Sequence, residues 1–179
     1  MYYHTTEATP IGEVMMAADE QHLIGLWLVG QKYFGATLTE EVKENNQLPI
    51  FLETKQWLAD YFSGQRPDIS RLSLRPSGNE FRQIVWQVLR EIPYGQVMTY
   101  KEVAQRSAER MNKPSMSAQA VGGAVGHNPI SIIIPCHRVI GSNGSLTGYA
   151  GGVLKKQRLL ELEGVAMTNL IVPTKSSAL

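Results

Sequence analysis

Short runs of apolar residues, separated by polar turns, dominate the first part of the chain. Residues 12–17 and 22–29 are rich in apolar side chains, and the polar residues 19–21 lie between them. This pattern predicts a β-hairpin. The following stretch, 37–46, is mostly polar, which predicts a loop or a frayed helix.

Two later stretches have the spacing of amphipathic helices. Apolar residues between 51 and 62 share one helical face, and Gly64 follows as a typical stop. From 81 to 92, apolar side chains again recur every three or four positions. The turn-forming residues 75–78 lie between the two stretches, so the sequence predicts a helix on each side of this break.

Two further helices are predicted beyond the break. Thr99 and Glu102 form a capping box that starts one of them, and the other runs on from Ala118, capped by Ser115 or Ser117. Two short helices joined by a turn are typical of a helix-turn-helix. An ordinary helical pair has the same periodicity, so the spacing leaves both interpretations open.

The isoleucine run 132–134 predicts a short buried strand. Pro135 cannot donate to a sheet ladder, so we expect the strand to end or turn there. Turn-forming residues at 141–145 and a glycine-rich loop at 147–152 come next. A basic helix is then predicted over 153–163.

These elements predict an α/β (α+β) protein with two domains. We place a sheet-plus-helix support domain at 1–76, a mainly helical domain at 77–168 and a loose tail at 169–179. With 43% hydrophobic and 18% charged residues, the 179-residue chain has the composition of an ordinary globular protein.

The composition also excludes several classes of protein. No apolar run approaches the roughly 20 residues that span a bilayer, and residues 1–5 show no secretory signal. The single cysteine excludes an internal disulfide and is typical of the reducing cytoplasm. A structural zinc site usually needs several Cys or His ligands, so a metal cluster of His127, Cys136 and His137 is disfavoured. We therefore expect a cytoplasmic protein without a metal or a membrane partner.

Charge is unevenly distributed, although the net charge is only +1. Residues 1–79 carry a net charge of −4, and residues 80–160 carry a net charge of +6. The basic middle of the chain favours a polyanionic partner such as nucleic acid. A solvated surface with an uneven charge distribution would give the same count.

Cys136 is the strongest candidate for chemistry, because it lies directly before His137 and Arg138. A thiol reacts as its thiolate, which a neighbouring base or positive charge favours. Consecutive strand residues point to opposite faces, so Cys136 and His137 can cooperate only through a backbone turn or a bridging water. A buried structural cysteine is an equally good interpretation of these residues alone.

The motif Pro135-Cys136-His137-Arg138-Val139 resembles the active site of the O6-alkylguanine-DNA alkyltransferases, also called methylated-DNA–protein-cysteine methyltransferases. The similarity covers roughly half of the chain with its spacing kept. It extends from about Phe81 through 121–124, 128–129 and 148–152 to 159–164. The resemblance implies a small ribonuclease H-like N-terminal domain and a winged helix-turn-helix-like domain that carries the active site.

The resemblance assigns catalytic roles to five residues. Cys136 is the acceptor of the alkyl group, His137 is the base that acts through a water, and Glu163 orients His137. The hydroxyl of Tyr100 approaches N3 of guanine and helps the base to leave. Asn128 ties the third helix of the second domain to the active-site turn.

The resemblance also implies how the substrate is bound. Around the guanine it places the ring of Tyr149, the carbonyls of Val139 and Cys136, the amide of Ala150, and Gly151, Val125 and Ser131. Family members flip the damaged nucleotide out of the duplex, and many insert an arginine from the third helix where this chain has Gln119. Many also have proline at the position of Ser131.

The segment around Gln119 supplies the predicted DNA contacts. Gln119, Ala118 and Gly122 follow from the resemblance. Four basic residues lie near the predicted helix-turn-helix, namely Lys101, Arg106, Arg110 and Lys113, and Arg138 lies beside Cys136. Their charges favour contacts with phosphates.

The sequence thus predicts a DNA repair protein that transfers an alkyl or methyl group from O6-alkylguanine, and from O4-alkylthymine, to Cys136. A thioether is a poor leaving group, so we expect each molecule to react once. We expect a monomer that acts on double-stranded DNA without a cofactor. A non-catalytic lesion-binding module is the first alternative, and the presence of Cys136 argues against it. A cysteine hydrolase is the second, and it would turn over.

Overall fold

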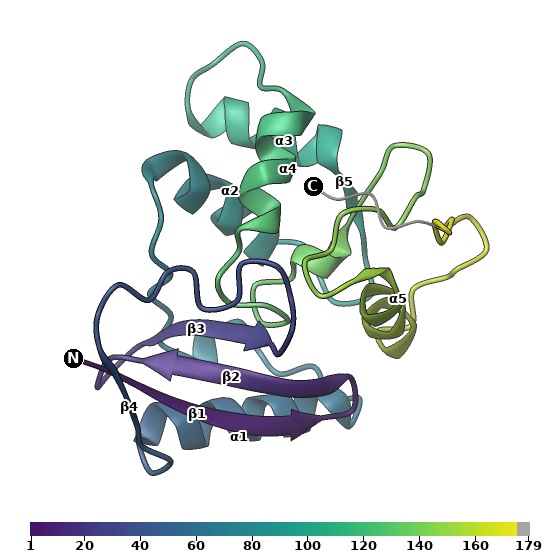
Figure 1. Ribbon diagram of the computed structural model, residues 1–179. Helices are drawn as coiled ribbons and strands as arrows, with labels where there is room; N and C mark the ends of the chain where they lie inside the picture. The colour runs from purple at the N-terminus through teal and green to yellow at the C-terminus, as the bar shows by residue number, and fades with distance from the viewer. Residues whose placement is uncertain (175–179) are drawn as a thin grey trace. The chain divides into compact units, whose positions relative to one another are not determined.

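The first residues of the chain form a four-stranded sheet, purple to blue in Figure 1. Its strands β1 (Tyr2–Thr9), β2 (Gly12–Ala18), β3 (Leu23–Leu28) and β4 (Val42–Glu44) lie in the order β3-β2-β1-β4. Neighbouring strands are antiparallel except β4, which runs parallel to β1. Helix α1 (Pro49–Phe62) packs against β1 and β2, and the short 3₁₀ helix η1 (Ile69–Arg71) follows it.

The predicted hairpin is confirmed as β2 and β3, but the prediction for the polar stretch 37–46 is wrong in part. Its residues 42–44 form the edge strand β4 instead of a loop or helix. The main chain of β1 gives this strand its pairing, and a half-exposed edge strand needs no apolar alternation. Local polarity therefore did not reveal it.

The computed structural model describes residues 1–174, and within them the chain forms two compact units. The first unit comprises Met1–Ser77 together with the short segment Pro129–Ile133. The second comprises Gly78–Asn128 and the chain from Ile134 onward. The division into domains at 1–76 and 77–168 stays a prediction.

Segment 129–133 joins the first unit by pairing with β3. The N–H of Leu26 donates to the carbonyl of Pro129 at 2.8 Å, and the N–H of Ser131 donates to the carbonyl of Leu26 at 2.9 Å. Beyond this short pairing the predicted isoleucine strand does not form, because the chain turns at Ile132. This residue has a φ of +71°, and the N–H of Ile133 donates to the carbonyl of Ser131 at 2.8 Å across it.

The second unit contains three helices that pack against one another, shown teal to green in Figure 1. They are α2 (Glu80–Arg90), α3 (Tyr100–Arg110) and α4 (Ala118–Gly126). The indole N–H of Trp86 on α2 donates to the carbonyl of Ala124 on α4 at 2.9 Å. The strand β5 (Met98–Thr99) pairs in parallel with β6 (Val139–Ile140), and helix α5 (Val153–Leu162) completes the unit.

Capping residues fix where α3 and α4 begin. The hydroxyl of Thr99 accepts a hydrogen bond from the N–H of Glu102, and the Glu102 carboxylate accepts one from the N–H of Thr99. The predicted capping box is therefore confirmed. Ser117, and not Ser115, caps α4 by accepting from the N–H of Ala120 at 3.0 Å.

The start of the predicted tail is hydrogen bonded within the second unit. The N–H of Ile171 donates to the carbonyl of Gly144, and its carbonyl accepts from the N–H of Leu146, both at 2.9 Å. Residues 175–179 of the predicted tail lie outside the described residues. Among residues 1–174, no helix combines the length and the hydropathy that crossing a membrane requires.

Candidate active site

Cys136 begins the short 3₁₀ helix η2 (Cys136–Arg138), whose three side chains are all buried. Pro135 turns the chain with φ −83° and ψ 65°, and the N–H of Cys136 donates to the carbonyl of Ile134 at 2.8 Å. The side-chain amide of Asn128 donates to the same carbonyl at 2.8 Å. Because the backbone turns here, Cys136 and His137 are not held on opposite faces of a strand.

Glu163, the residue that caps the end of α5, holds a buried carboxylate at the centre of this site. Its Oε2 lies 2.6 Å from Nε2 of His137, and its Oε1 lies 2.7 Å from Nε of Arg138. The N–H of Gly95 also donates to Oε1 at 3.3 Å. Burial would raise the pKa of Glu163, but the hydrogen bonds and charges of His137 and Arg138 outweigh it and lower the pKa below its ordinary value.

The ionised state of Glu163 decides the tautomer of His137. A carboxylate only accepts hydrogen bonds, so Nε2 of His137 must carry the proton that it donates. Its Nδ1 is buried and has no hydrogen-bond partner among the described residues. Burial lowers the pKa of His137 despite the opposing effect of Glu163, so the ring is neutral at neutral pH with Nδ1 free to accept a proton.

The thiol of Cys136 is buried and unpaired in any disulfide. Burial raises its pKa, while the side chain of Asn128, the charge of Lys156 and the N–H groups of Cys136 and His137 act in the opposite direction. These groups would all be stabilising for a thiolate. The site therefore favours a protonated thiol at rest and holds several groups that assist its ionisation.

Arg138 does not lie where a contact with DNA phosphates requires it. Its side chain is buried, and besides binding Glu163 it donates from Nη1 to the carbonyl of Ile92 at 2.7 Å. Its guanidinium lies 5.8 Å from the centre of the Tyr94 ring. The carboxylate of Glu163 holds the guanidinium of Arg138 inside the second unit. The charge of Arg138 therefore neutralises Glu163 and is not exposed on the surface.

Two tyrosines that the sequence assigned to guanine lie in the same unit. The hydroxyl of Tyr100, in the first turn of α3, donates to the carbonyl of Thr147 at 3.0 Å. The hydroxyl of Tyr149 is buried and has no partner among the described residues. Burial, with a contribution from the charge of Cys136, raises the pKa of both. Leaving a buried hydroxyl without a hydrogen-bond partner costs about 1–3 kcal/mol. An unpaired hydroxyl of this kind is typical of a site that a ligand completes.

Lys156 is a buried member of the site that sequence reasoning missed. Its ammonium donates to the carbonyl of Val139 and, at 3.1 Å, to that of Thr147. Burial lowers its pKa to about 8. Helical spacing could have revealed it, because Leu159 and Leu160, three and four positions later, form the apolar face of α5.

The remaining predicted substrate residues occupy different environments. Val139 and Val125 are buried, and Ala150 and Gly151 are half-buried in the loop before α5. Ser131 belongs to the first unit, where its hydroxyl donates to Oε1 of Gln31 at 3.2 Å. The carbonyl of Val139, predicted to contact guanine, accepts a hydrogen bond from the ammonium of Lys156.

The predicted DNA contacts other than Arg138 lie on two helices. Lys101 and Arg106 are exposed on α3, and Ala118 and Gln119 are exposed at the start of α4. Gly122 is buried one turn further along α4. Among residues 1–174, no group of three His, Cys, Asp or Glu side chains is placed to hold a metal ion.

Comparison with known proteins covers almost the whole chain. Residues 80–165 match the family model of the 6-O-methylguanine DNA methyltransferase DNA binding domain, and residues 1–76 match that of its ribonuclease-like domain. The methylated-DNA–protein-cysteine methyltransferase of Haemophilus influenzae is 38% identical over 163 residues, which cover 91% of this chain and 87% of that protein. That of Methanosarcina acetivorans is 42% identical over 165 residues, which cover 92% and 99%.

A solved structure shows the same similarity in three dimensions. The crystal structure of Mycobacterium tuberculosis OGT in complex with DNA matches with a TM-score of 0.77 at 38% sequence identity. The match covers 90% of this chain and 93% of that chain.

Replacing Glu163 by Gln should lower the free energy of unfolding by about 3–5 kcal/mol at neutral pH, because Arg138 would lose the charge that compensates its burial. The carboxyl pKa is lowered from its ordinary value of 4.5 in the folded protein. The ionised carboxylate therefore makes its full contribution to the free energy of unfolding above pH 4.5, and this contribution is lost as the pH falls below 4.5.

Urea denaturation between about pH 3 and pH 7 measures this contribution. The matched control is Glu161→Gln, since Glu161 lies exposed on the same helix. The control should retain nearly all of the parent's stability. Equal unfolding free energies for Glu163→Gln and the parent at every pH would contradict the assigned role of the carboxylate.

Proposed function

The chain belongs to the 6-O-methylguanine DNA methyltransferase family, and from this we propose that it repairs DNA by moving an alkyl group from O6-alkylguanine to its own Cys136. The observation that carries the assignment to this residue is its placement at the start of η2, directly before a histidine that an ionised Glu163 orients. The chain holds no other cysteine. O4-alkylthymine is a second proposed substrate, since it presents the same kind of alkyl–oxygen bond.

The proposed reaction is a single displacement at carbon. The thiol proton leaves toward Nδ1 of His137 through a water, which converts Cys136 to its thiolate. The thiolate sulfur forms a bond to the alkyl carbon while the bond from that carbon to O6 breaks. The electron pair stays with the guanine, which takes up one proton. The protein keeps the alkyl group as a thioether, so each molecule reacts once.

Tyr100 is the proposed donor of the proton to guanine, and it recovers a proton from His137 through water. Its hydroxyl donates to the carbonyl of Thr147 in the structure, so it must exchange this partner for N3 of the guanine when the substrate enters. The raised pKa of Tyr100 keeps the hydroxyl protonated at physiological pH. Tyr149, whose buried hydroxyl has no partner among the described residues, is the proposed wall of the base pocket.

Double-stranded DNA is the proposed partner, with the damaged nucleotide flipped out of the stack. A base inside a duplex cannot reach a buried thiol, and flipping costs a few kcal/mol in lost pairing and stacking. A reactive thiol must also stay reduced, which supports a cytoplasmic location. No step of this reaction requires a cofactor.

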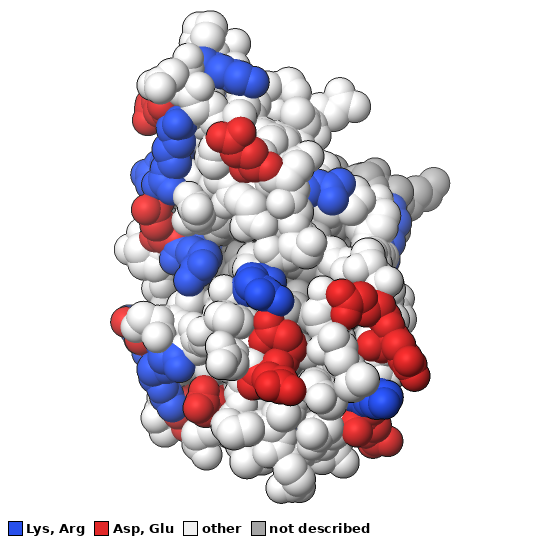
Figure 2. All heavy atoms as spheres, turned by 90° about the vertical axis from the view of Figure 1, so that its left-hand side faces the viewer, with Lys and Arg blue, Asp and Glu red and all other residues white. Residues whose placement is uncertain are grey.

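The proposed DNA-binding surface lies on α3 and the start of α4. Lys101 and Arg106 are exposed there, whereas the guanidinium of Arg110 pairs with Glu91. Figure 2 shows one face of the molecule, on which blue cationic side chains alternate with red acidic ones. The proposed phosphate contacts are the exposed cations Lys101 and Arg106. Arg138 is withdrawn from this set because it is buried.

Replacing Cys136 by Ser should abolish alkyl transfer while leaving the fold and the binding of DNA intact, because serine has nearly the same shape and a far weaker nucleophile. Incubation with a duplex that contains radiolabelled O6-methylguanine tests this. Intact-mass analysis of the parent should show one added methyl group per protein molecule. Label on another residue, or many turnovers per molecule, would contradict the proposal.

Replacing Arg106 by Ala should weaken binding to any duplex and reduce the slope of log affinity against log salt by about one unit. The comparison variant is Arg110→Ala, whose charge is already paired with Glu91, so its effect should be smaller. Fluorescence anisotropy at a series of salt concentrations measures both. A slope equal to the parent's for Arg106→Ala would remove this residue from the binding surface.

Gln119 is the proposed wedge that fills the space of the flipped base. It is exposed in the first turn of α4, and its amide can hydrogen-bond the orphaned partner base. Gln119→Ala should therefore slow repair of duplex DNA more than reaction with the free modified base, where no stack must open. Gln119→Arg should tighten DNA binding through its added charge. Equal effects on both substrates, or none, would show that Gln119 is not the wedge.

A further inference from the structure

Lys156 places a positive charge inside the second unit without an acidic partner. The residue is fully buried, and its ammonium donates hydrogen bonds to the carbonyls of Val139 and Thr147. Its ammonium also lies 5.8 Å from the centre of the Tyr100 ring. Within residues 1–174 it forms no ion pair with a carboxylate, because Glu163, the buried acid of this site, is bound by His137 and Arg138.

An unmatched buried charge is costly, and proteins usually neutralise it or pair it. A side chain of similar length that ends in a methyl group, such as that of methionine, would fill the same space without that cost. Carbonyl dipoles and an aromatic ring offset part of the cost, but they do not supply a negative charge. The buried ammonium interacts electrostatically with the thiol of Cys136, which indicates a use that appears only when an anion forms nearby.

The other titratable groups around the thiol of Cys136 are neutral or already paired, which leaves the thiolate of Cys136 as the anion that Lys156 can match. His137 follows Cys136 on η2, and burial lowers its pKa, so it is neutral at rest. Arg138 is matched by Glu163. Tyr100 on α3 and Tyr149 in the loop before α5 both have raised pKa values and are uncharged before the reaction.

Lys156 is thus the cation near the thiol that is left without a counter-charge among the described residues. Electrostatics connect the two groups in both directions. The charge of Lys156 acts to lower the pKa of Cys136, and a thiolate at Cys136 acts to raise the pKa of Lys156.

We propose that the buried Lys156 ammonium is the counter-charge of the Cys136 thiolate, and that it is a positioning residue that acts on the reaction through the thiol. This inference rests on the proposed alkyl transfer, in which the thiolate is the reacting species. The two hydrogen bonds to Val139 and Thr147 hold the ammonium in place. Glu163 remains the partner of His137 and Arg138 throughout.

Lys156 takes no part in the bond changes. The thiol proton passes through water to His137, and the ammonium keeps all three of its protons. When the sulfur has accepted the alkyl carbon and guanine has left with the electron pair of the broken bond, Cys136 is a neutral thioether. Lys156 then loses its counter-charge, so alkylation should make its proton easier to remove.

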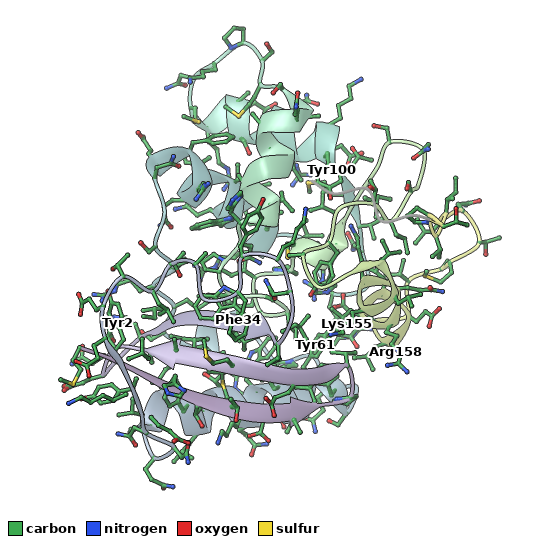
Figure 3. The ribbon with its side chains drawn as sticks, viewed as in Figure 1. Tyr2, Phe34, Tyr61, Tyr100, Lys155 and Arg158 are labelled. Atoms are coloured by element: carbon green, nitrogen blue, oxygen red, sulfur yellow. The ribbon has the colours of Figure 1, made fainter. Side chains whose placement is uncertain are left out.

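The first experiment titrates the thiolate by its ultraviolet absorbance, with the Cys136→Ser form of each protein as the blank. Lys156→Met removes the charge and keeps an apolar side chain, while Lys156→Arg keeps the charge. The matched control is Lys155→Met; Figure 3 shows Lys155 on α5, apart from Tyr100 at the start of α3. Single-turnover transfer from O6-methylguanine duplex is measured on the same proteins, together with their duplex affinity.

Lys156→Met should raise the midpoint of thiolate formation by at least about one pH unit, which corresponds to a tenfold loss of thiolate at neutral pH. Transfer should slow by the same factor without a change in duplex affinity. Lys156→Arg should have the same midpoint of thiolate formation as the parent, and so should Lys155→Met. A parental midpoint in Lys156→Met, or a midpoint raised equally in Lys156→Arg, would overturn the proposal.

A second measurement decides the question if Lys156→Met does not fold. Side-chain NMR of isotopically labelled lysine follows the titration of Lys156 in the parent, in the alkylated protein and in Cys136→Ser. The pKa of Lys156, about 8 in the structure, should be lower in the two forms that cannot make a thiolate. Equal values in all three would overturn the proposal. The absence of alkyl transfer by the parent would refute the proposed function instead, because the titrations do not depend on repair.

Discussion

The buried carboxylate of Glu163 joins three separate segments of the second unit. His137 and Arg138 bind it from η2, the N–H of Gly95 binds it from the turn after α2, and Glu163 itself ends α5. Arg138 extends this network to the carbonyl of Ile92. A buried carboxylate is tolerable only with this many donors, so the end of α5, the turn after α2 and the active-site turn must fold together.

The same carboxylate sets the chemistry of the site. Because it stays ionised, it accepts the Nε2 proton of His137 and leaves Nδ1 with a lone pair. Because it also neutralises Arg138, the positive charge nearest to Cys136 in sequence has its counter-ion already. The electrostatic assistance available to a thiolate therefore comes from Lys156, Asn128 and backbone N–H groups. Structure and reactivity in this unit thus depend on one buried negative charge.

The backbone before the cysteine has its own constraint. Ile132 has a positive φ, which is unfavourable for a β-branched residue and persists only where the surroundings impose it. Asn128 holds the carbonyl of Ile134, and Pro135 restricts the next turn. An extended strand, in contrast, would have separated the side chains of Cys136 and His137. The turn is therefore a requirement of the site, and it is maintained by residues on both sides of it.

Local patterns in the sequence determined much of this protein. Helical spacing predicted α1, α2 and α3, the capping box fixed the start of α3, and alternating apolar runs predicted β2 and β3. The motif around Cys136 identified the family and pointed to site residues that, apart from Ser131, lie in the second unit. Each of these signals lies within a few residues along the chain, where spacing reports the conformation of the backbone and the buried face.

Only the tertiary structure decided which distant partner each buried polar group finds. Arg138 binds Glu163 25 residues away, and Lys156 binds the carbonyl of Val139 17 residues away. The positive charge of Arg138 suggested a contact with phosphates, and Lys156 was predicted only as part of a basic helix. The polar strand β4 likewise depends on β1 for its hydrogen bonds. The sequence does not show which residue a charged side chain will pair with. Burial of that charge becomes favourable only once folding brings the partner to it.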